Sequence, residues 1–301
     1  MVSAACRELL LDAQRFSATF GGGLFNHLPM ALLALDRLGA DDVRLRAFFT
    51  TYSKHLRPKS DAETKLAETM RGQRAADVVP QLSAGVASQA FHGLIRVAYA
   101  VDSGVDADIP DALAAWKGGF SELPDRGTER FATFADAFAA VAADERLPRN
   151  VDGRSIDARI ARVIALPAFA DYLGTIAHVA LPDMASTSAR VYASSADFVA
   201  LHMVTGCHAM RVLAPFLGPR ALHVFATAIL AAHVAIGRPP LASSITPVLP
   251  SDAQLAARAV PGGDDHDLKM VYSCLREEAE YRTGWHRFAA AVRLADDGQE
   301  R

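Results

Sequence analysis

The spacing of apolar residues restricts the possible folds of this chain more than any other feature of its sequence. Apolar residues recur at intervals of three and four rather than two, and Ala, Leu and Arg dominate the composition. This spacing places apolar side chains along one face of an α-helix, whereas a half-buried strand requires strict alternation. The sequence therefore predicts an all-α protein.

The helices are expected to pack into one compact domain. Hydrophobic residues make up 51% of the 301 residues and charged residues 22%, which is sufficient for a sizeable core. The length fits a single multi-helix domain over residues 1–301, or two tightly packed helical halves. We expect helices near residues 4–19, 29–38, 41–55, 64–79, 81–101, 111–120, 130–143, 156–163, 169–179, 187–213, 219–236 and 265–294.

One stretch is predicted to lie outside these helices. Residues 237–263 are rich in Pro and Gly and predict a long surface loop, and loops of this length are often functional lids. The preceding apolar stretch, residues 221–237, contains two histidines and is shorter than the about 20 residues of a membrane span. We interpret it as a buried core helix and expect no membrane association.

Charge and cysteine content exclude several classes of partner and site. A formal net charge of -3 gives no general attraction to nucleic acid or anionic lipid. Three cysteines without CxxC spacing fit reduced thiols rather than disulfides or a thiolate zinc site. The first residues lack the pattern of a signal peptide, so we expect a cytoplasmic protein.

Common catalytic motifs are missing from the sequence. HExxH, GxxxxGKS/T, GxSxG and GxGxxG do not occur, and neither do the ExxH pairs of ferritin-like di-iron bundles. An NADPH requirement is left open, although no motif for binding a dinucleotide is present. The ten histidines are then the main candidates for chemistry, because imidazoles inside apolar helices need a partner.

Two histidines lie early in the chain. His27 directly precedes the helix expected to start at Pro29 and fits either a turn residue or an inward-pointing ligand. His92 is expected in the middle of a helix, where it shares one face with Arg96 and Tyr99. A structural hydrogen-bond network would give the same pattern, but Gly93 beside His92 indicates close approach of a backbone or ligand.

Three more histidines lie in two later segments. His202 and His208 point in directions that differ by about 120° on an ideal helix, so both reach one metal only if the helix distorts at Gly206. Otherwise one of them is a ligand and the other supports it.

His266, Lys269 and Tyr272 share one face of the last helix. A lysine binds metal only after losing its proton, for example as a carbamate formed with carbon dioxide. Structural or surface roles are expected for the remaining histidines, which are His55, His178, His223, His233 and His286.

Four segments resemble the questin oxidase-like family. They are NHLPMAL at residues 26–32, FHGLIR at 91–96, LHMVTGCHAMR at 201–211 and DHDLK at 265–269. Fungal members are associated with oxidative cleavage of polyketide rings in secondary metabolism, including Baeyer-Villiger-like opening of anthraquinones such as questin. The resemblance therefore implies an oxygenase that acts on a small aromatic, quinone-type substrate with dioxygen.

The resemblance also implies a site between the helices. It indicates non-haem Fe(II) held by several histidines and a modified, carboxylated lysine. Carried over to this chain, the ligand candidates are His27, His92, His202, His208 and Lys269, with His266 as a substitute. Arg96 or Arg211 is expected to stabilise a substrate anion, and Tyr99 or Tyr272 to donate a proton.

Two other functions compete with this interpretation. The pair His266-Asp267 also occurs in helical metal-dependent phosphohydrolases, but the expected later aspartate ligand could only be Asp296 or Asp297. A non-catalytic helical protein that binds an aromatic ligand is the second alternative. Bound metal would distinguish it from an oxygenase.

Overall fold

The computed structural model describes residues 1–124, 127–218, 220–245 and 248–295. The protein is all-α, as the sequence predicts, and its buried apolar residues form one contiguous core. The first half contains α1 (Ala4–Ala13), α2 (Leu28–Arg37), α3 (Asp42–Tyr52), α4 (Asp61–Met70), α5 (Ala75–Leu82), α6 (His92–Ser103) and α7 (Ile109–Gly118). The second half contains α8 (Phe134–Ala143), α9 (Ile156–Ile164), α10 (Leu181–Ser195), α11 (Phe198–Leu213), α12 (Arg220–Ala235), α13 (Asp252–Ala259), α14 (Asp265–Tyr281) and α15 (Trp285–Ala295).

Short elements connect these helices. Two antiparallel strands, β1 (Thr19–Phe20) and β2 (Leu24–Phe25), form a hairpin, and β3 (Phe131–Thr133) pairs in parallel with β4 (Ile176–His178). Short 3₁₀ helices are η1 (Ser53–His55), η2 (Ser83–Gly85), η3 (Asp106–Asp108) and η4 (Pro167–Tyr172). No helix within the described ranges is long and apolar enough to cross a membrane.

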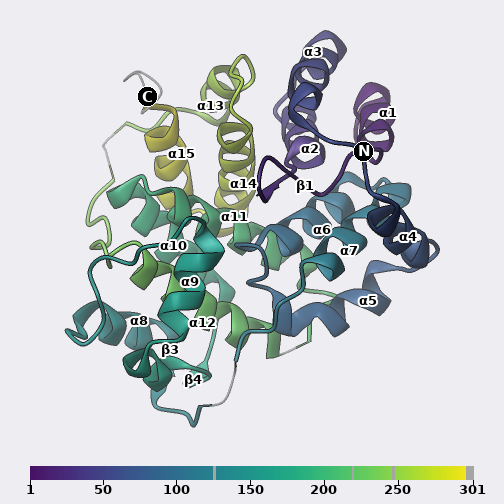
Figure 1. Ribbon diagram of the computed structural model, residues 1–301. Helices are drawn as coiled ribbons and strands as arrows, with labels where there is room; N and C mark the ends of the chain where they lie inside the picture. The colour runs from purple at the N-terminus through teal and green to yellow at the C-terminus, as the bar shows by residue number, and fades with distance from the viewer. Residues whose placement is uncertain (125–126, 219, 246–247, 296–301) are drawn as a thin grey trace.

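Helices from distant parts of the sequence meet at the centre of the molecule. Figure 1 shows the N-terminal helices α1 to α4 on one side, α8 and α12 on the other, and α11 and α14 between them. Helix α11 packs against α6, α10 and α14, while α14 also packs against α2. The starts of α2, α6, α11 and α14 are therefore brought together, and this junction contains the candidate site.

Helix α6 begins at His92 and not before it. The sequence predicts one helix over residues 81–101, but Gln89, Ala90 and Phe91 all have left-handed backbones, with φ of 54°, 55° and 69°. This conformation costs roughly 1–2 kcal/mol for each non-glycine residue, so tertiary contacts must hold the turn. His92 is consequently the first residue of its helix instead of a residue within it.

Other predicted helices are also shorter than expected. The first ends at Ala13, and the β1–β2 hairpin follows, turning at Gly21-Gly22-Gly23. The predicted helix 187–213 is broken at Ala196, and the predicted helix 265–294 is broken at Arg282. Each of these residues has a left-handed backbone and forms the C-cap of the helix before it. Hydrophobic periodicity continues across such breaks and does not reveal them.

The predicted loop at 237–263 is wrong in part. Its residues 252–259 form α13, which begins with a capping box made by Ser251 and Gln254. A Ser followed three residues later by Gln is a sequence signal for a helix start, and it outweighs the Pro and Gly content. None of the described residues of 237–263 lines the main pocket, so no lid function is supported there.

Candidate metal centre

Four histidines from four helix starts lie against one another. His27 is the N-cap of α2, His92 begins α6, His202 follows the first turn of α11, and His266 lies in the first turn of α14. Ring centroids are 4.7 Å apart for His27 and His92, for His92 and His202, and for His27 and His266. We call these four residues the histidine cluster.

The Nδ1 atom of each ring in the histidine cluster has a hydrogen-bond partner. His92 Nδ1 contacts the carbonyl oxygen of Gln89, and His202 Nδ1 lies 2.8 Å from that of Phe198. Because a carbonyl only accepts, both rings donate from Nδ1 and carry a lone pair on Nε2.

The other two rings have the same arrangement. The Asp265 carboxylate contacts His27 Nδ1 at 3.0 Å and His266 Nδ1 at 2.6 Å. A carboxylate also accepts, so the lone pairs of His27 and His266 lie on Nε2 as well.

Two of the Nε2 lone pairs, those of His92 and His202, meet without a proton between them. The Nε2 atoms of His92 and His202 are 3.2 Å apart, and those of His27 and His266 are buried with no hydrogen-bond partner among the described residues. Two lone pairs at this distance repel each other unless a cation lies between them. Two imidazole nitrogens, each about 2.1 Å from a shared metal, would be about 3.0–3.4 Å apart. The donor set fits a metal that binds imidazole.

Burial favours the neutral form, which binds metal, for three rings of the cluster, those of His27, His92 and His202. Burial lowers the pKa of His27 to about 3, with a further contribution from Lys269, and lowers those of His92 and His202 well below the ordinary value. These three rings are therefore neutral at neutral pH and available as nitrogen ligands of a metal ion.

Asp265 organises one side of the cluster. It accepts hydrogen bonds from His27, His266 and the Tyr52 hydroxyl, the last at 2.7 Å. Burial alone would raise the pKa of this carboxyl group, but interaction with His27 and His266 holds it well below its ordinary value. The ligand atoms of His27, Asp265 and His266 lie within 4.8 Å of one another. Asp265 thus fixes two rings through Nδ1, which is a typical role of a carboxylate beside a metal ligand.

Lys269 is buried one turn after His266 on α14. Only 2% of its surface is exposed, and burial lowers the pKa of its ammonium group to about 8, although Asp265 and Asp264 act in the opposite direction. It is close enough to the histidine cluster to lower the pKa of His27, His92 and His202. A substantial neutral fraction of this amine is therefore available near pH 8.

A pocket of about 420 Å³ opens onto the histidine cluster. This volume is typical of small-molecule sites. Three phenylalanines, Phe20, Phe25 and Phe198, line it, and Phe25 stacks on His92 at 4.9 Å with an interplanar angle of 16°. Another wall comes from the start of α9 and includes Asp157. The pocket therefore places aromatic side chains beside the histidines.

Comparison with known proteins identifies the family of this chain. A family profile described as questin oxidase-like matches residues 73–274, which is more than half of the chain. The chain belongs to the questin oxidase-like family. Membership indicates an oxidase-type oxidoreductase, and the matched region includes His92, His202, His266 and Lys269. No curated protein gives a match.

His208 of this questin oxidase-like protein does not join the histidine cluster. Helix α11 is unbroken from Phe198 to Leu213, so Gly206 causes no distortion and His208 points in another direction from His202. Its Nδ1 contacts Glu277 at 2.8 Å, and Glu277 also accepts from Arg211 at the same distance. Both His208 and Arg211 therefore belong to a separate buried polar group.

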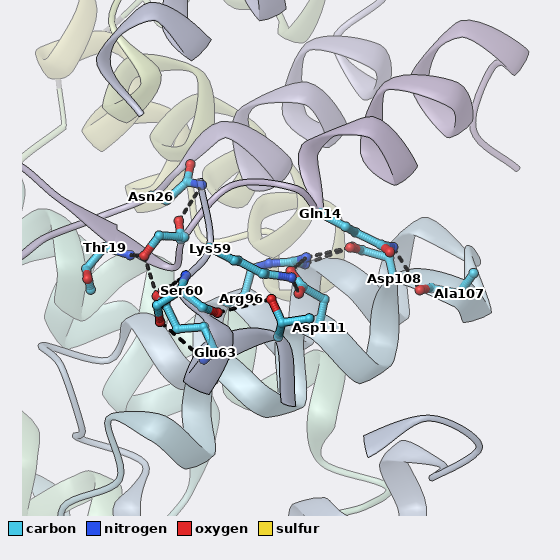
Figure 2. A network of polar contacts seen from close by, with 12 residues as sticks. Gln14, Thr19, Asn26, Lys59, Ser60, Glu63, Arg96, Ala107, Asp108 and Asp111 are labelled. Carbon is cyan, nitrogen blue, oxygen red and sulfur yellow. Dashed lines mark hydrogen bonds and ion pairs between the residues drawn. The ribbon is translucent and has the colours of Figure 1, made fainter. Parts of the chain in front are cut away.

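The three predicted catalytic residues have structural partners. Arg96 forms a two-point ion pair with Asp108, in the network that Figure 2 shows around Lys59 and Asp111. The Tyr99 hydroxyl contacts Ser273 at 2.9 Å, and the Tyr272 hydroxyl donates to Asp102. None of the three is among the described residues that line the pocket.

Sequence reasoning missed several residues of the questin oxidase-like site. Asp265 had an available signal, because it directly precedes His266 in the segment that resembles the family. Tyr52, Gln89 and Asp157 had none, since they reach the pocket only through tertiary contacts. The phosphohydrolase alternative loses its motif here, because Asp267 pairs with Arg293 in a buried ion pair.

Proposed function

We propose that this protein is a non-haem iron oxygenase that opens a ring of an aromatic, quinone-type substrate. The observation that carries the proposal is the contact of four imidazoles whose Nδ1 atoms all have partners, together with the approach of the His92 and His202 Nε2 atoms to 3.2 Å. Family membership supports the oxidase class, and the aromatic pocket supports the substrate class.

The residues proposed to hold the iron are His27, His92, His202, His266 and Lys269. Four helix N-termini point toward this junction, and their partial positive charges disfavour a cation unless an anionic ligand is also present. Lys269 can supply that anion as a carbamate. Its neutral amine adds to carbon dioxide, forming a nitrogen–carbon bond and releasing one proton, and the carbamate oxygen then becomes the ligand.

Bound Fe(II) would supply the binding and activation of dioxygen. The protein's own residues would orient the substrate and control protons. Phe25 and Phe198 would hold the aromatic ring, and the surrounding apolar side chains would exclude water. Asp157 lines the pocket and is accessible to solvent there. Partial loss of hydration raises the pKa of its carboxyl group to about 6. Its carboxylate is able to accept the proton of a substrate hydroxyl group.

Elemental analysis of untagged protein purified without oxygen tests the metal. We expect about one iron per chain in the wild type. His202→Ala should lose most of it, because the paired Nε2 atoms of His92 and His202 are only 3.2 Å apart. His178→Ala is the matched control, since His178 is an exposed histidine on β4, away from the pocket residues.

Oxygen consumption with hydroquinone-type compounds tests the reaction. Turnover that depends on iron and on His202 would support ring oxidation. A folded wild-type protein that binds neither Fe(II) nor Co(II) would refute the proposal and favour a non-catalytic protein that binds an aromatic ligand.

The carbamate has its own test. Lys269→Ala should lose iron affinity and regain part of it when acetate is added, because acetate can supply the missing oxygen ligand. Restored binding with formamide, which is uncharged, would contradict the need for an anion.

A further inference from the structure

A left-handed turn directly precedes the metal ligand candidate His92. Gln89, Ala90 and Phe91 all adopt positive φ, although none of them is glycine, and Ala90 and Phe91 are buried. Such residues persist only where the surrounding structure holds them. The turn brings the Gln89 carbonyl to both the backbone N–H and the Nδ1 atom of His92.

Asp157 contacts the middle of this turn from another helix. It lies in the first turn of α9, and its Oδ1 accepts a hydrogen bond from the backbone N–H of Ala90. Helix α9 is held independently of Asp157, because it packs against α12 and its first turn is capped by the Ser155 side chain, which accepts from the backbone N–H of Ala158. The carboxylate is thus presented from an anchored helix start, 67 residues along the chain from Ala90.

We propose that Asp157 is a positioning residue that holds the turn at residues 89–91 and thereby fixes the orientation and tautomer of His92. The connection runs from Asp157 Oδ1 to Ala90 N–H, through the peptide chain to the Gln89 carbonyl, and from there to His92 Nδ1–H. Without Asp157, the N–H of a 3% exposed residue would lose its acceptor. The turn could then relax toward right-handed backbone and move the Gln89 carbonyl away from the ring.

The consequence for metal affinity depends on the proposed function, whereas the consequence for the tautomer does not. Two measurements therefore separate the two ideas. Ring ¹⁵N–¹H correlation spectra of metal-free protein report which nitrogen of His92 carries the proton, with the signal assigned through His92→Gln. Titration with Co(II), followed by its visible absorption, reports metal affinity.

The variants separate the hydrogen bond from the charge. Asp157→Ala should shift His92 away from a pure Nδ1–H tautomer and weaken Co(II) binding at least about tenfold, the lower end of effects seen for residues that orient metal ligands. Asp157→Asn should keep both properties, because its amide oxygen still accepts from Ala90 N–H. Asp183→Ala, which removes an exposed carboxylate from the first turn of α10, is the matched control and should change neither.

A second substitution tests the turn itself. Ala90→Gly in the Asp157→Ala background should restore part of the Co(II) affinity, since glycine adopts positive φ without strain. Unchanged tautomer and affinity in Asp157→Ala would refute the positioning role. Equal losses in Asp157→Asn and Asp157→Ala would also refute it, because the charge and not the hydrogen bond would then matter. A wild type without Co(II) affinity but with an Asp157-dependent tautomer would refute only the proposed metal site.

Discussion

Replacing Gly93 with alanine should destabilise the protein, although alanine is the better helix former. A Cβ atom at this position would lie 2.4 Å from Cδ1 and 2.7 Å from Cγ of Trp116. Real Cβ atoms do not approach other atoms this closely, so either the ring or α6 must move. Trp116 is fully buried, and its Nε1–H donates to the Gly85 carbonyl at 3.0 Å, so the ring is held from both sides.

The expected magnitude follows from three contributions. Overpacking costs about 1–3 kcal/mol, the weakened indole hydrogen bond costs about 1 kcal/mol, and the helix propensity of alanine returns about 1 kcal/mol. Gly93→Ala should therefore lower the free energy of unfolding by about 1–3 kcal/mol. Gly206→Ala in α11 is the matched control, because its Cβ would meet Phe225 only at 3.3 Å and a small movement suffices. It should stay within about 1 kcal/mol of the wild type.

Equilibrium urea unfolding followed by circular dichroism and tryptophan fluorescence measures both variants. A lower midpoint with an unchanged slope would show reduced stability without a change in the surface exposed on unfolding. If Gly93→Ala were as stable as Gly206→Ala, the close packing of α6 on Trp116 would be refuted.

Two further predictions concern buried charged and titratable groups. His233 is fully buried, and burial lowers its pKa from 6.5 to about 3. Between these two pH values the imidazole is protonated in the unfolded state but neutral in the folded state. The free energy of unfolding therefore falls as the pH falls, by about 2 kcal/mol at pH 5. His233→Leu should remove this part of the loss between pH 7.5 and 5. If urea unfolding showed the same pH dependence for the variant and the wild type, this assignment would be contradicted. Arg96→Met should cost about 3–5 kcal/mol in the same melts, because Asp108 is 1% exposed and would be left unpaired. If Arg96→Met kept normal stability but lost turnover, Arg96 would instead have a role in substrate binding.

The fold class was predictable because it depends on local periodicity. Helices from α2 to α4 begin near the expected residues, where capping residues such as Asp41 and Ser60 are visible in the sequence. The break before His92 was not predictable in this way. Its turn consists of ordinary residues, and a hydrogen bond from Asp157, far along the chain, holds it. Sequence periodicity contains no information about such a contact.

The candidate site was predictable only in part. Family resemblance named His27, His92, His202, His266 and Lys269, and the structure brings the four histidines together and buries the lysine beside them. The same resemblance suggested His208, but a continuous α11 directs it toward Glu277. Roles for Arg96 and Tyr99 were inferred from a shared helix face with His92. A shared face says nothing about which neighbours a side chain meets, and Arg96 meets Asp108.

The pairing of His27 with Asp265 has a consequence for the order of assembly. These residues are 238 positions apart, so the cluster closes a loop that contains most of the chain. A metal ion bound by both His27 and His266 would act as a cross-link. A cross-link that closes a loop of this length lowers the entropy of the unfolded chain and stabilises the fold by about 5 kcal/mol. During synthesis, His27 can meet Asp265 and His266 only after α14 has left the ribosome. Loading of the proposed metal would thus be among the last events in the maturation of this protein.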